Sequence, residues 1–381
     1  MTDYDYVVVG LGGLGSATAY HLARRGFSVL GLERFELGHA RGASHDTSRI
    51  LRHSYHTPEY VRLTQEAYVD WSMLSAQAGR DLVTVVGGLD LFPADPAIPM
   101  ADYTDSLTAV GVPYELLGVD EIAARWPQFA LPEGTVGLYQ DRGAIVPAGP
   151  ATKVMQELAV RYGAVLRDRS RVTGLTDTSV TVEDGTTYTC RGIVVCADAW
   201  TNDLLRHLDH EIPLTVTLEQ ATYFAPERPE DFAPERMPLW IWMDEPSFYG
   251  FPCYGEPTIK AAQDCGGPPV DPDDRTSEPD PDQLALLAGH VNRMLPGSGR
   301  PVRSLRCQYT LTPDRDFVMD RVPGHESVVV GLGAAHGFKF APTFGRLLAG
   351  LVCGDRTTVS PTFSLRRPAL TDPDYTPHWL V

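Results

Sequence analysis

Asp5-Tyr-Val-Val-Val-Gly-Leu-Gly-Gly-Leu-Gly15 is the stretch that decides the fold of the first part of the chain. Three consecutive valines followed by glycine predict a short buried parallel strand. Gly10, Gly12 and Gly15 then follow the pattern G-x-G-x-x-G. The first glycine allows a tight turn, the second lets the backbone approach a pyrophosphate, and the third lets the next helix pack on the strand. That helix, expected over residues 16–25, would point its N-terminal N–H groups at phosphate.

A second strand is expected over residues 28–32, and it ends in Glu33. A carboxylate at this place can accept two hydrogen bonds from a ribose diol and repels a 2′-phosphate, so it favours an adenosine without that phosphate. The glycine pattern alone is a weak signal. Here strand, glycines, helix, strand and acidic residue follow one another within the length of one βαβ unit. The stretch therefore predicts dinucleotide binding, and it leaves open whether the dinucleotide is FAD or NAD.

Composition narrows the class of protein. With 381 residues the chain exceeds the usual size of one domain, so two domains are expected. A net charge of −17 argues against nucleic acid and against an anionic membrane surface as partners. No apolar stretch is long enough to span a bilayer, and the first strand begins too soon after Met1 for a signal peptide, so a cytoplasmic protein is expected. The six scattered cysteines form no C-x-x-C pair, which predicts thiols and no metal site.

Downstream of the first βαβ unit, the pattern alternates between helical and strand-like segments. Helices are expected over residues 60–78, 120–126, 150–162, 283–295 and, as the last one, 344–352. A strand over residues 192–196 runs into a helix and is expected to return to the first sheet. Strands that form an antiparallel sheet are expected over residues 214–218, 221–224, 239–243, 248–252 and 258–261. Further strands are expected over residues 83–92, 164–167, 171–175, 302–310, 317–320 and 327–331, with a hairpin at 180–190.

This order predicts an α/β fold in which a Rossmann-type dinucleotide-binding domain is interleaved with a mostly antiparallel β-sheet domain. The dinucleotide domain would comprise residues 1–80, 141–212 and 303–381. The substrate-binding domain would comprise residues 81–140 and 213–302. Such a discontinuous arrangement counts against a simple NAD dehydrogenase, which usually keeps its Rossmann half in one piece.

Six short motifs resemble one known family. Besides the glycine pattern they are Ser44-His45-x-x-x-Arg49-x-x-Arg52-His53, Phe248-Tyr249-Gly-Phe-Pro, Lys260, Arg306-Cys307-x-Tyr309-Thr and His336-Gly337-Phe338-Lys339-Phe340. Together they are similar to monomeric sarcosine oxidase and N-methyltryptophan oxidase, which are D-amino-acid-oxidase-like flavoproteins. The resemblance covers nearly the whole chain, with the motifs in the same order.

The resemblance implies FAD as the cofactor, and it implies that FAD is held by non-covalent contacts and by one covalent bond. Contacts are implied for Gly10, Gly12, Gly15, Glu33, Arg34, Ser44, Arg49, Val172, Gly337, Phe338 and Lys339. A thioether to the flavin 8α-methyl group is implied for Cys307. From the residues alone, a buried strand thiol is the favoured interpretation of Cys307, as for most free cysteines, although the neighbouring Arg306 could favour its thiolate form.

The resemblance also assigns roles at the substrate end. Lys339 alternates with phenylalanines and could be an ammonium at the edge of an apolar pocket, whereas most lysines are surface charges. Arg52 offers a planar fork suited to a carboxylate. The family uses these two positions to clamp the substrate carboxylate. Lys260, by itself a solvated strand-end lysine, is implied to lie over flavin N5 and to activate dioxygen.

The remaining implied residues surround this centre. Arg49 would keep the flavin face positive, and His45, Tyr249 and Tyr309 would line the cavity, although strand tyrosines are most often packing residues. Two positions depart from the family pattern. Asp264 stands near a place where the family often has histidine, so it could favour a cationic or polar substrate group. Asp198 replaces a glycine at a strand end.

These observations predict an FAD-dependent oxidase of secondary amino acids, either N-methylated or cyclic. A hydride would pass from the C–H next to nitrogen to flavin N5, dioxygen would be reduced to hydrogen peroxide, and an imine would be released. Partners are therefore a small secondary amine with a carboxylate and dioxygen, and a monomer is expected. The alternatives are a flavin-dependent dehydrogenase with another electron acceptor, a tailoring oxidase of a biosynthetic intermediate, and a flavin-binding protein without turnover. The walls that select the substrate are expected around Trp240, Trp242 and Tyr254.

Overall fold

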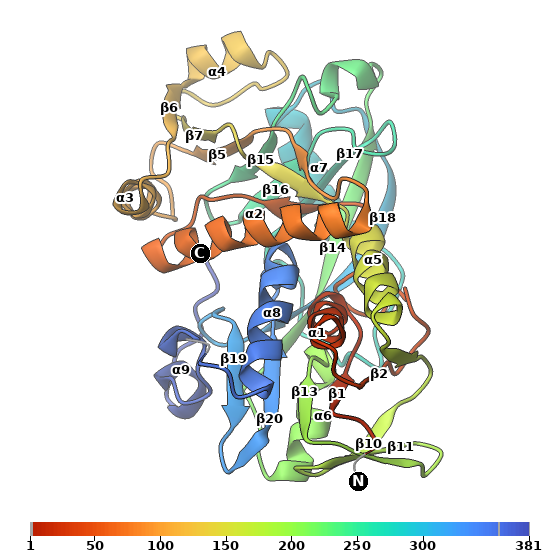
Figure 1. Ribbon diagram of the computed structural model, residues 1–381. Coiled ribbons are helices and arrows are strands. Elements are labelled where there is room, and N and C mark those ends of the chain that lie inside the picture. Colours follow the sequence, from red (N-terminus) through yellow and green to blue (C-terminus); the bar gives the residue numbers. More distant parts are fainter. Residues whose placement is uncertain (1–2, 357–358, 381) are drawn as a thin grey trace.

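The computed structural model describes residues 3–356 and 359–380 (Figure 1). The strands are β1 Tyr6–Val9, β2 Val29–Leu32, β3 Arg49–Leu51, β4 Thr84–Val85, β5 Gly88–Phe92, β6 Glu115–Gly118, β7 Val136–Gln140, β8 Ala144–Val146, β9 Val165–Arg167, β10 Val172–Leu175, β11 Ser179–Val182, β12 Thr187–Thr189, β13 Gly192–Val195, β14 Thr215–Ala225, β15 Leu239–Trp242, β16 Phe248–Phe251, β17 Ile259–Gln263, β18 Arg300–Leu311, β19 Val318–Val322 and β20 His325–Leu332. The helices are α1 Gly13–Arg24, α2 Pro58–Ala78, α3 Met100–Val110, α4 Val119–Arg125, α5 Ala148–Arg161, α6 Thr201–Leu205, α7 Pro281–Met294, α8 Ala341–Val352 and α9 Pro368–Thr371.

A six-stranded sheet in the order β19-β20-β13-β1-β2-β9 contains the predicted βαβ unit. All of its neighbouring pairs are parallel except β19 and β20. The valines of β1 are buried at its centre, as expected for a strand covered on both faces. Strands from the middle and the end of the chain, β13 and β20, lie beside β1, so the predicted return to the first sheet is confirmed.

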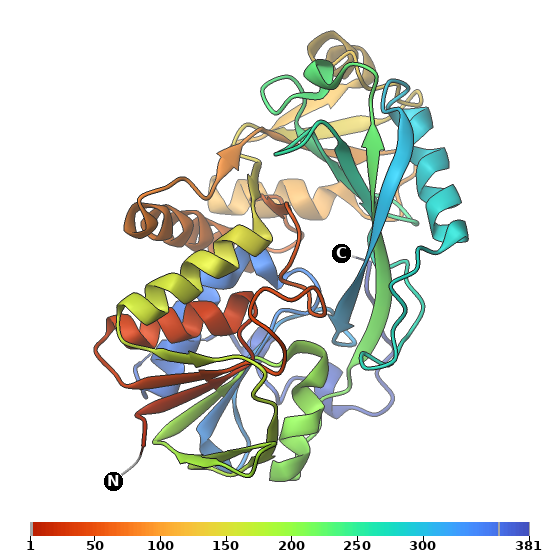
Figure 2. The same cartoon turned by 90° about the vertical axis from the view of Figure 1, so that its right-hand side faces the viewer.

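Helices α1, α5 and α8 cover one face of this sheet, and the small sheet β10-β11-β12 with α6 covers the other (Figure 2). Gly15 explains how α1 approaches β1. A Cβ atom at Gly15 would meet the carbonyl oxygen of Gly10 at 1.8 Å, and one at Gly345 would meet the Cβ of Ala17 at 2.4 Å. Glycines therefore bring α1 against the strand end and α8 against α1.

The second large sheet has eight strands in the order β18-β14-β17-β16-β15-β5-β7-β6. Its pairs are antiparallel apart from β15 and β5, which run parallel. One face packs on α7 and α4 around the buried Trp240 and Phe248. The alternate side chains of β15 to β18 point away from that core and toward the six-stranded sheet. Figure 2 shows the long strands β14 and β18 running side by side from one half of the molecule to the other.

Several predicted elements differ from the structure. The two strands expected at 214–218 and 221–224 are one strand, β14, because the polar Glu219 and Gln220 between them are buried and hydrogen-bonded. The strand expected over residues 83–92 is interrupted at Gly87, whose φ is +80°, and its parts β4 and β5 join different sheets. The last helix is α9, after the α8 that was expected to end the chain. Helix α3 was not predicted.

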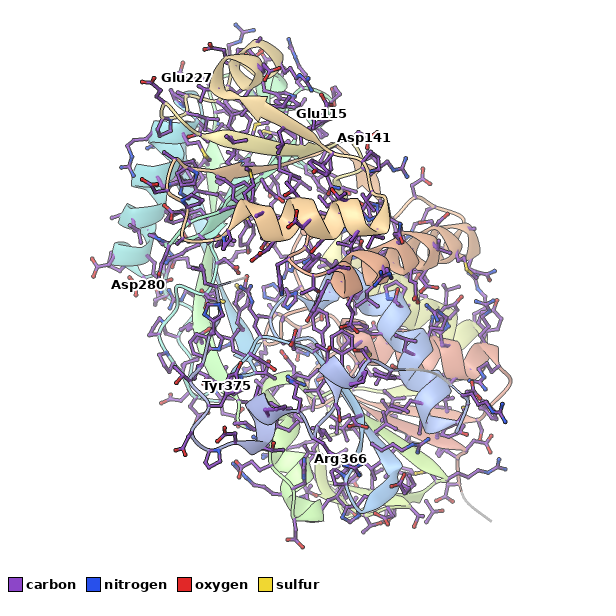
Figure 3. The ribbon with its side chains drawn as sticks, turned by 90° about the vertical axis from the view of Figure 1, so that its left-hand side faces the viewer. Glu115, Asp141, Glu227, Asp280, Arg366 and Tyr375 are labelled. Carbon is purple, nitrogen blue, oxygen red and sulfur yellow. The ribbon has the colours of Figure 1, made fainter. Side chains whose placement is uncertain are left out.

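The two large sheets suggest how to divide the chain, and we propose a domain around each. Strand β18 pairs along its length with β14, so residues 303–311 lie with the eight-stranded sheet, although the sequence division placed them with the six-stranded one. Helix α2 lies between the halves and packs on α8, α5 and α3 (Figure 1). In Figure 3, Glu115 and Glu227 mark the outer end of the eight-stranded half, and Arg366 and Tyr375 mark the C-terminal segment beside the other half.

Candidate active site

A cavity of about 1100 Å³ lies between the glycine-rich end of the six-stranded sheet and the inward face of the eight-stranded sheet. We call it the central cavity. Of the residues predicted to bind the cofactor, to bind the substrate carboxylate or to take part in catalysis, only Gly15 does not line it. Its walls include Gly10, Gly12, Glu33, Arg34, Ser44, His45, Arg49, Arg52, Val172, Tyr249, Lys260, Asp264, Cys307, Tyr309, Gly337, Phe338 and Lys339. Residues from distant parts of the sequence thus line one cavity, which is large enough for a dinucleotide and a small substrate.

At one end of the central cavity the backbone is prepared for a dinucleotide. Gly10 has a φ of +90°, and a Cβ there would meet the carbonyl oxygen of Cys196 at 2.3 Å. The backbone N–H of Gly13, in the first turn of α1, donates to Ser44 Oγ at 2.8 Å. The carboxylate of Glu33 accepts the N–H groups of Leu11 at 2.8 Å and Phe35 at 3.1 Å, which fixes it at the strand end.

Two further residues lie at this end. The guanidinium of Arg34 pairs with Asp273 at 2.9 Å and lies over the ring of Trp200, with 5.3 Å between the guanidinium carbon and the ring centroid. Asp198, which replaces the family's glycine, has a φ of +48°. The backbone therefore keeps the left-handed conformation that favours glycine, although the side chain differs. Burial raises the pKa of Asp198 to about 6.

Cys307 is half-buried on the cavity face of β18. Burial raises the pKa of the Cys307 thiol to about 11, while Arg49 and Lys260 oppose that rise. The prediction that Arg306 favours the thiolate is wrong, because neighbouring strand residues point to opposite faces. Arg306 Nη1 instead donates to Gln220 at 3.1 Å and to Gln283 on α7 at 3.2 Å.

Lys260 is a buried side chain on β17, and its ammonium forms an ion pair. Its Nζ lies 2.6 Å from Asp46 Oδ2 and donates to the carbonyl oxygen of Ser48 at 3.1 Å. Burial and the nearby Arg49 lower the pKa of Lys260 to about 8, and Asp46 opposes that fall. The interpretation of Lys260 as a solvated strand-end residue is thus excluded, since only 4% of it is exposed.

Arg52, directly after β3, also lines the central cavity, in the part that takes up the substrate in the predicted arrangement. Its Nη1 donates to Asp90 Oδ2 on β5 at 2.7 Å and to Ser54 Oγ at 3.0 Å, whereas its Nε is buried without a partner. Asp90 is 2% exposed, and burial raises the pKa of its carboxyl group against the opposing effect of Arg52. Part of the predicted carboxylate fork is therefore already held by an internal carboxylate.

Lys339 completes this part of the cavity. Its Nζ donates to the hydroxyl of Tyr55 at 2.8 Å, and among the described residues it has no carboxylate within ion-pair distance. Burial, together with the cations Arg52 and Arg315, lowers the pKa of Lys339 well below its usual value. The carboxylate of Asp264 is already paired with another cation, because Arg315 Nη2 donates to it at 2.8 Å. Two of the three cations here are thus paired, and Lys339 is left for an external anion.

The other predicted wall residues are also in place. Tyr249 and Tyr309 have their hydroxyl oxygens 3.5 Å apart. Arg49 donates to the carbonyl oxygens of Ser48 and Ala43 at 2.8 and 2.9 Å. Burial lowers the pKa of His45 to about 4, and its Nε2 is buried without a partner. The three residues expected to form the substrate walls do not line the cavity. Trp240 and Trp242 pack in the core with α7, Tyr254 accepts a hydrogen bond from Thr84 at 3.4 Å, and Ile241 between the tryptophans lines the cavity.

Sequence reasoning missed the ionic partners. Asp46, Asp90 and Arg315 each pair with a predicted residue, yet none is part of a motif. Asp46 stands between the predicted His45 and Arg49, so its place in that loop was a usable signal. Asp90 and Arg315 gave none, because their partners are 38 and 51 residues away in sequence.

These residues fit FAD. A glycine turn that a Cβ would fill lies at the dinucleotide end, cations and an unpartnered histidine nitrogen lie farther along, and a thiol stands on the wall. We found no cluster of three or more potential metal ligands in residues 3–356 and 359–380. Within that same part of the chain, no helix is long and apolar enough to cross a membrane.

Comparisons with known proteins point in one direction. A protein family described as FAD dependent oxidoreductase matches residues 5–351. The monomeric sarcosine oxidase of Streptomyces avermitilis is 35% identical over 362 residues, which covers 91% of this chain and 93% of the relative. The human peroxisomal sarcosine oxidase is 32% identical over 355 residues, with 91% of each chain covered. Among solved structures, NikD, described as an unusual amino acid oxidase essential for nikkomycin biosynthesis, has a TM-score of 0.85 at 29% identity, covering 95% of this chain and 97% of NikD.

Proposed function

Because the chain belongs to the family of FAD-dependent oxidoreductases, we propose that it is an FAD-dependent oxidase of secondary amino acids. The predicted relationship to sarcosine oxidase and N-methyltryptophan oxidase is confirmed by relatives of both kinds. When bound, FAD supplies the acceptor for the hydride of the C–H next to nitrogen, and dioxygen then takes the two electrons and leaves as hydrogen peroxide. The organic product is an imine. A monomeric state and a cytoplasmic location stay predictions from the sequence.

One observation carries the proposal: Lys339 lines the same cavity as the dinucleotide turn and, among the described residues, has no carboxylate within ion-pair distance. A carboxylate bound between Lys339 and the free edge of Arg52 would restore charge balance there. Such a clamp orients the carbon next to nitrogen toward the middle of the cavity, where Cys307 and Lys260 lie. Orientation of this kind supplies a large part of the rate acceleration. The enclosing walls also exclude water from the reacting bond.

The test is an anaerobic screen in which secondary amino acids are mixed with the yellow protein. We expect sarcosine-like or cyclic secondary amino acids to bleach the flavin absorbance, and matched amines without a carboxylate to fail. Admission of air should restore the colour and release hydrogen peroxide. If bleaching occurs but only an artificial acceptor restores the colour, the protein is a dehydrogenase. If no carboxylate-bearing secondary amine bleaches the flavin, the proposal is wrong.

We propose that Cys307 holds the flavin covalently. Its side chain lines the central cavity beside the cations Arg49 and Lys260, which stabilise negative charge on sulfur. Acid precipitation of the native protein should therefore leave the yellow colour in the pellet. The Cys307→Ser variant should release it into the supernatant, while Cys253→Ser, a buried thiol outside the cavity, should behave as the native protein does. Free colour from the native protein would contradict the attachment.

Carboxylate binding is expected to take up a proton. In the empty site the pKa of Lys339 is lowered by burial and by Arg52 and Arg315, so above that lowered pKa the side chain is neutral. A bound carboxylate stabilises the ammonium and raises the pKa again. Affinity should therefore be full below the pKa of the empty site and fall as pH rises toward the ordinary lysine value of 10.5. Calorimetry of pyrrole-2-carboxylate binding in buffers of different ionisation enthalpy measures this uptake directly, and an enthalpy independent of buffer would contradict it.

A further inference from the structure

A chain of hydrogen bonds runs from Lys339 through Tyr55 and His336 to Arg315, all of which line the central cavity. Lys339 Nζ lies 2.8 Å from Tyr55 Oη, Tyr55 Oη lies 3.2 Å from His336 Nδ1, and His336 Nε2 lies 3.0 Å from the carbonyl oxygen of Arg315. Each link has the distance of an ordinary hydrogen bond. The chain therefore ties the ammonium of Lys339 to the backbone of Arg315.

Only one arrangement of protons satisfies all three links. The carbonyl oxygen of Arg315 can only accept, so the proton of the neutral imidazole of His336 is on Nε2. His336 Nδ1 must then accept, and the hydroxyl of Tyr55 is its donor. Since that proton is committed to His336, the oxygen of Tyr55 can only accept from Lys339. Burial and the nearby Arg315 and Lys339 lower the pKa of His336 well below its usual value, which keeps the imidazole neutral.

His336 is packed as an aromatic residue would be. Its ring centroid lies 4.4 Å from that of Phe317 and 6.0 Å from that of Tyr60, with an interplanar angle of 26° to the latter. A phenylalanine could fill this place without the cost of burying two ring nitrogens. The nitrogens are thus explained by their hydrogen bonds and not by packing.

The backbone on both sides of the His336 to Arg315 contact is strained. Ala334 and Ala335, directly before His336, have φ values of +40° and +72°, and Arg315 has a φ of +61°. Residues other than glycine rarely adopt such φ values, and these backbone conformations persist where the surrounding structure imposes them. Arg315 is held further by its guanidinium, which donates to Asp264 at 2.8 Å and to the carbonyl oxygen of Trp379 at 2.8 Å. Strain on both partners indicates that the position of this contact is enforced.

On the basis of the proposed function, we propose that His336 is a positioning residue: it fixes the Tyr55 hydroxyl as an acceptor and thereby directs the ammonium of Lys339 at the substrate carboxylate. His336 does so through the hydroxyl of Tyr55 and not by binding the carboxylate itself. If its acceptor were removed, the hydroxyl of Tyr55 could turn and donate to a neutral Lys339 amine. That arrangement stabilises the uncharged form, which binds a carboxylate poorly.

The charges around Lys339 make the direction of one hydroxyl matter. Arg52 and Arg315 disfavour the ammonium, while Asp90 and Asp264 favour it, and burial disfavours it most. Tyr55 and His336 are the neutral groups in the hydrogen-bond chain behind it. Burial and the two arginines outweigh the two carboxylates, so the pKa of Lys339 is lowered. The neutral amine therefore competes with the ammonium at accessible pH.

The test measures binding of pyrrole-2-carboxylate, through the change that it causes in the flavin spectrum, between pH 6 and pH 10. His336→Phe keeps the ring packing and removes both hydrogen bonds. We expect it to bind the probe about tenfold more weakly at neutral pH and to lose binding at a lower pH than the native protein. Turnover at saturating substrate should change much less than KM.

Two matched variants separate the links. His336→Asn keeps an acceptor near the place of Nδ1 and should bind the probe almost as the native protein does. His336→Gln keeps a donor near Nε2 but offers Tyr55 no acceptor there, and it should resemble His336→Phe. This pair also decides the matter if His336→Phe does not fold. In a Tyr55→Phe background, His336→Phe should have no further effect, because it acts through the missing hydroxyl.

The outcomes are distinct. An unchanged pH profile in His336→Phe and His336→Gln, or full additivity with Tyr55→Phe, would overturn the inference while the proposed function stood. If the native protein neither bound the probe nor was bleached by any secondary amino acid, the proposed function would fail, and this inference with it.

Discussion

Replacement of Lys260 by methionine is expected to slow the reoxidation of the reduced flavin by dioxygen about 10²- to 10³-fold. Superoxide must form before peroxide does, and a fixed cation stabilises that developing negative charge in a buried site. Lys260 is 4% exposed, lines the central cavity and needs no reorganisation to act. Methionine keeps the length and the apolar contacts of the stem and removes the charge. Reduction of the flavin by substrate should change little, because Lys260 does not belong to the carboxylate end.

Stopped-flow absorbance measures both half-reactions separately. The protein is first reduced anaerobically with substrate and is then mixed with buffers of known dioxygen concentration. Reoxidation in Lys260→Met at the native rate would remove the support for an oxidase and favour a flavin-dependent dehydrogenase. Slowing of both half-reactions to the same extent would instead indicate general damage to the site.

Asp46 supplies a control that separates charge from shape. Its carboxylate lies 2.6 Å from Lys260 Nζ, and without it burial and Arg49 would lower the pKa of Lys260 below about 8. The protonated form is the active one, so native reoxidation should be full below pH 8 and fall above it. Asp46→Asn should shift that fall to lower pH and leave the rate at low pH nearly native. A pH-independent loss in Asp46→Asn would show that the ion pair holds the loop in shape and does not keep the charge.

The parts of the fold that were predicted correctly depend on local patterns. Three valines and a glycine turn define β1 and α1 because burial on both faces and the turn conformation act over a few residues. The same holds for α2, which was expected over residues 60–78 and begins at Pro58, after the N-cap Thr57. The pairing of β15 with β5 was not predictable, because the paired residues, such as Gly88 and Leu239, lie 151 positions apart and nothing in either strand specifies a parallel neighbour.

The candidate site shows the same limit. Motif matching brought Lys260, Cys307 and Lys339 into the correct cavity. Their pKa values are shifted mainly by burial and also by Asp46, Glu219 and Arg315, which belong to no motif. The error over Arg306 has this cause, since adjacency in sequence places two strand residues on opposite faces. Charge balance in a buried site depends on partners brought together by the fold, and sequence spacing does not reveal them.

The second large effect is expected for Lys339. Lys339→Met should lower kcat/KM for a carboxylate-bearing secondary amine about 10²- to 10³-fold, since a buried hydrogen-bonded charge partner of the substrate is lost. Its activity on a matched amine without the carboxylate, however low, should not fall further. The melting temperature should not fall, because Lys339 has no internal carboxylate to leave unpaired. Steady-state kinetics with the matched pair of amines, together with thermal unfolding, measures these expectations.

Arg52→Met is the informative comparison with Lys339→Met. Both substitutions remove a cation from the proposed carboxylate site, but only Arg52→Met leaves an internal carboxylate, Asp90, without its partner. Arg52→Met leaves Asp90, which is 2% exposed, without its partner at 2.7 Å, and breaking a buried pair in this way costs about 3–5 kcal/mol of stability. The double variant Arg52→Met with Asp90→Leu should regain most of that stability but not the activity, since the fork for the carboxylate is still absent. Recovery of activity in the double variant would mean that Asp90, when unpaired, was repelling the substrate and that Arg52 does not bind it. Loss of stability in Lys339→Met equal to that in Arg52→Met would contradict the view that Lys339 is reserved for an external anion.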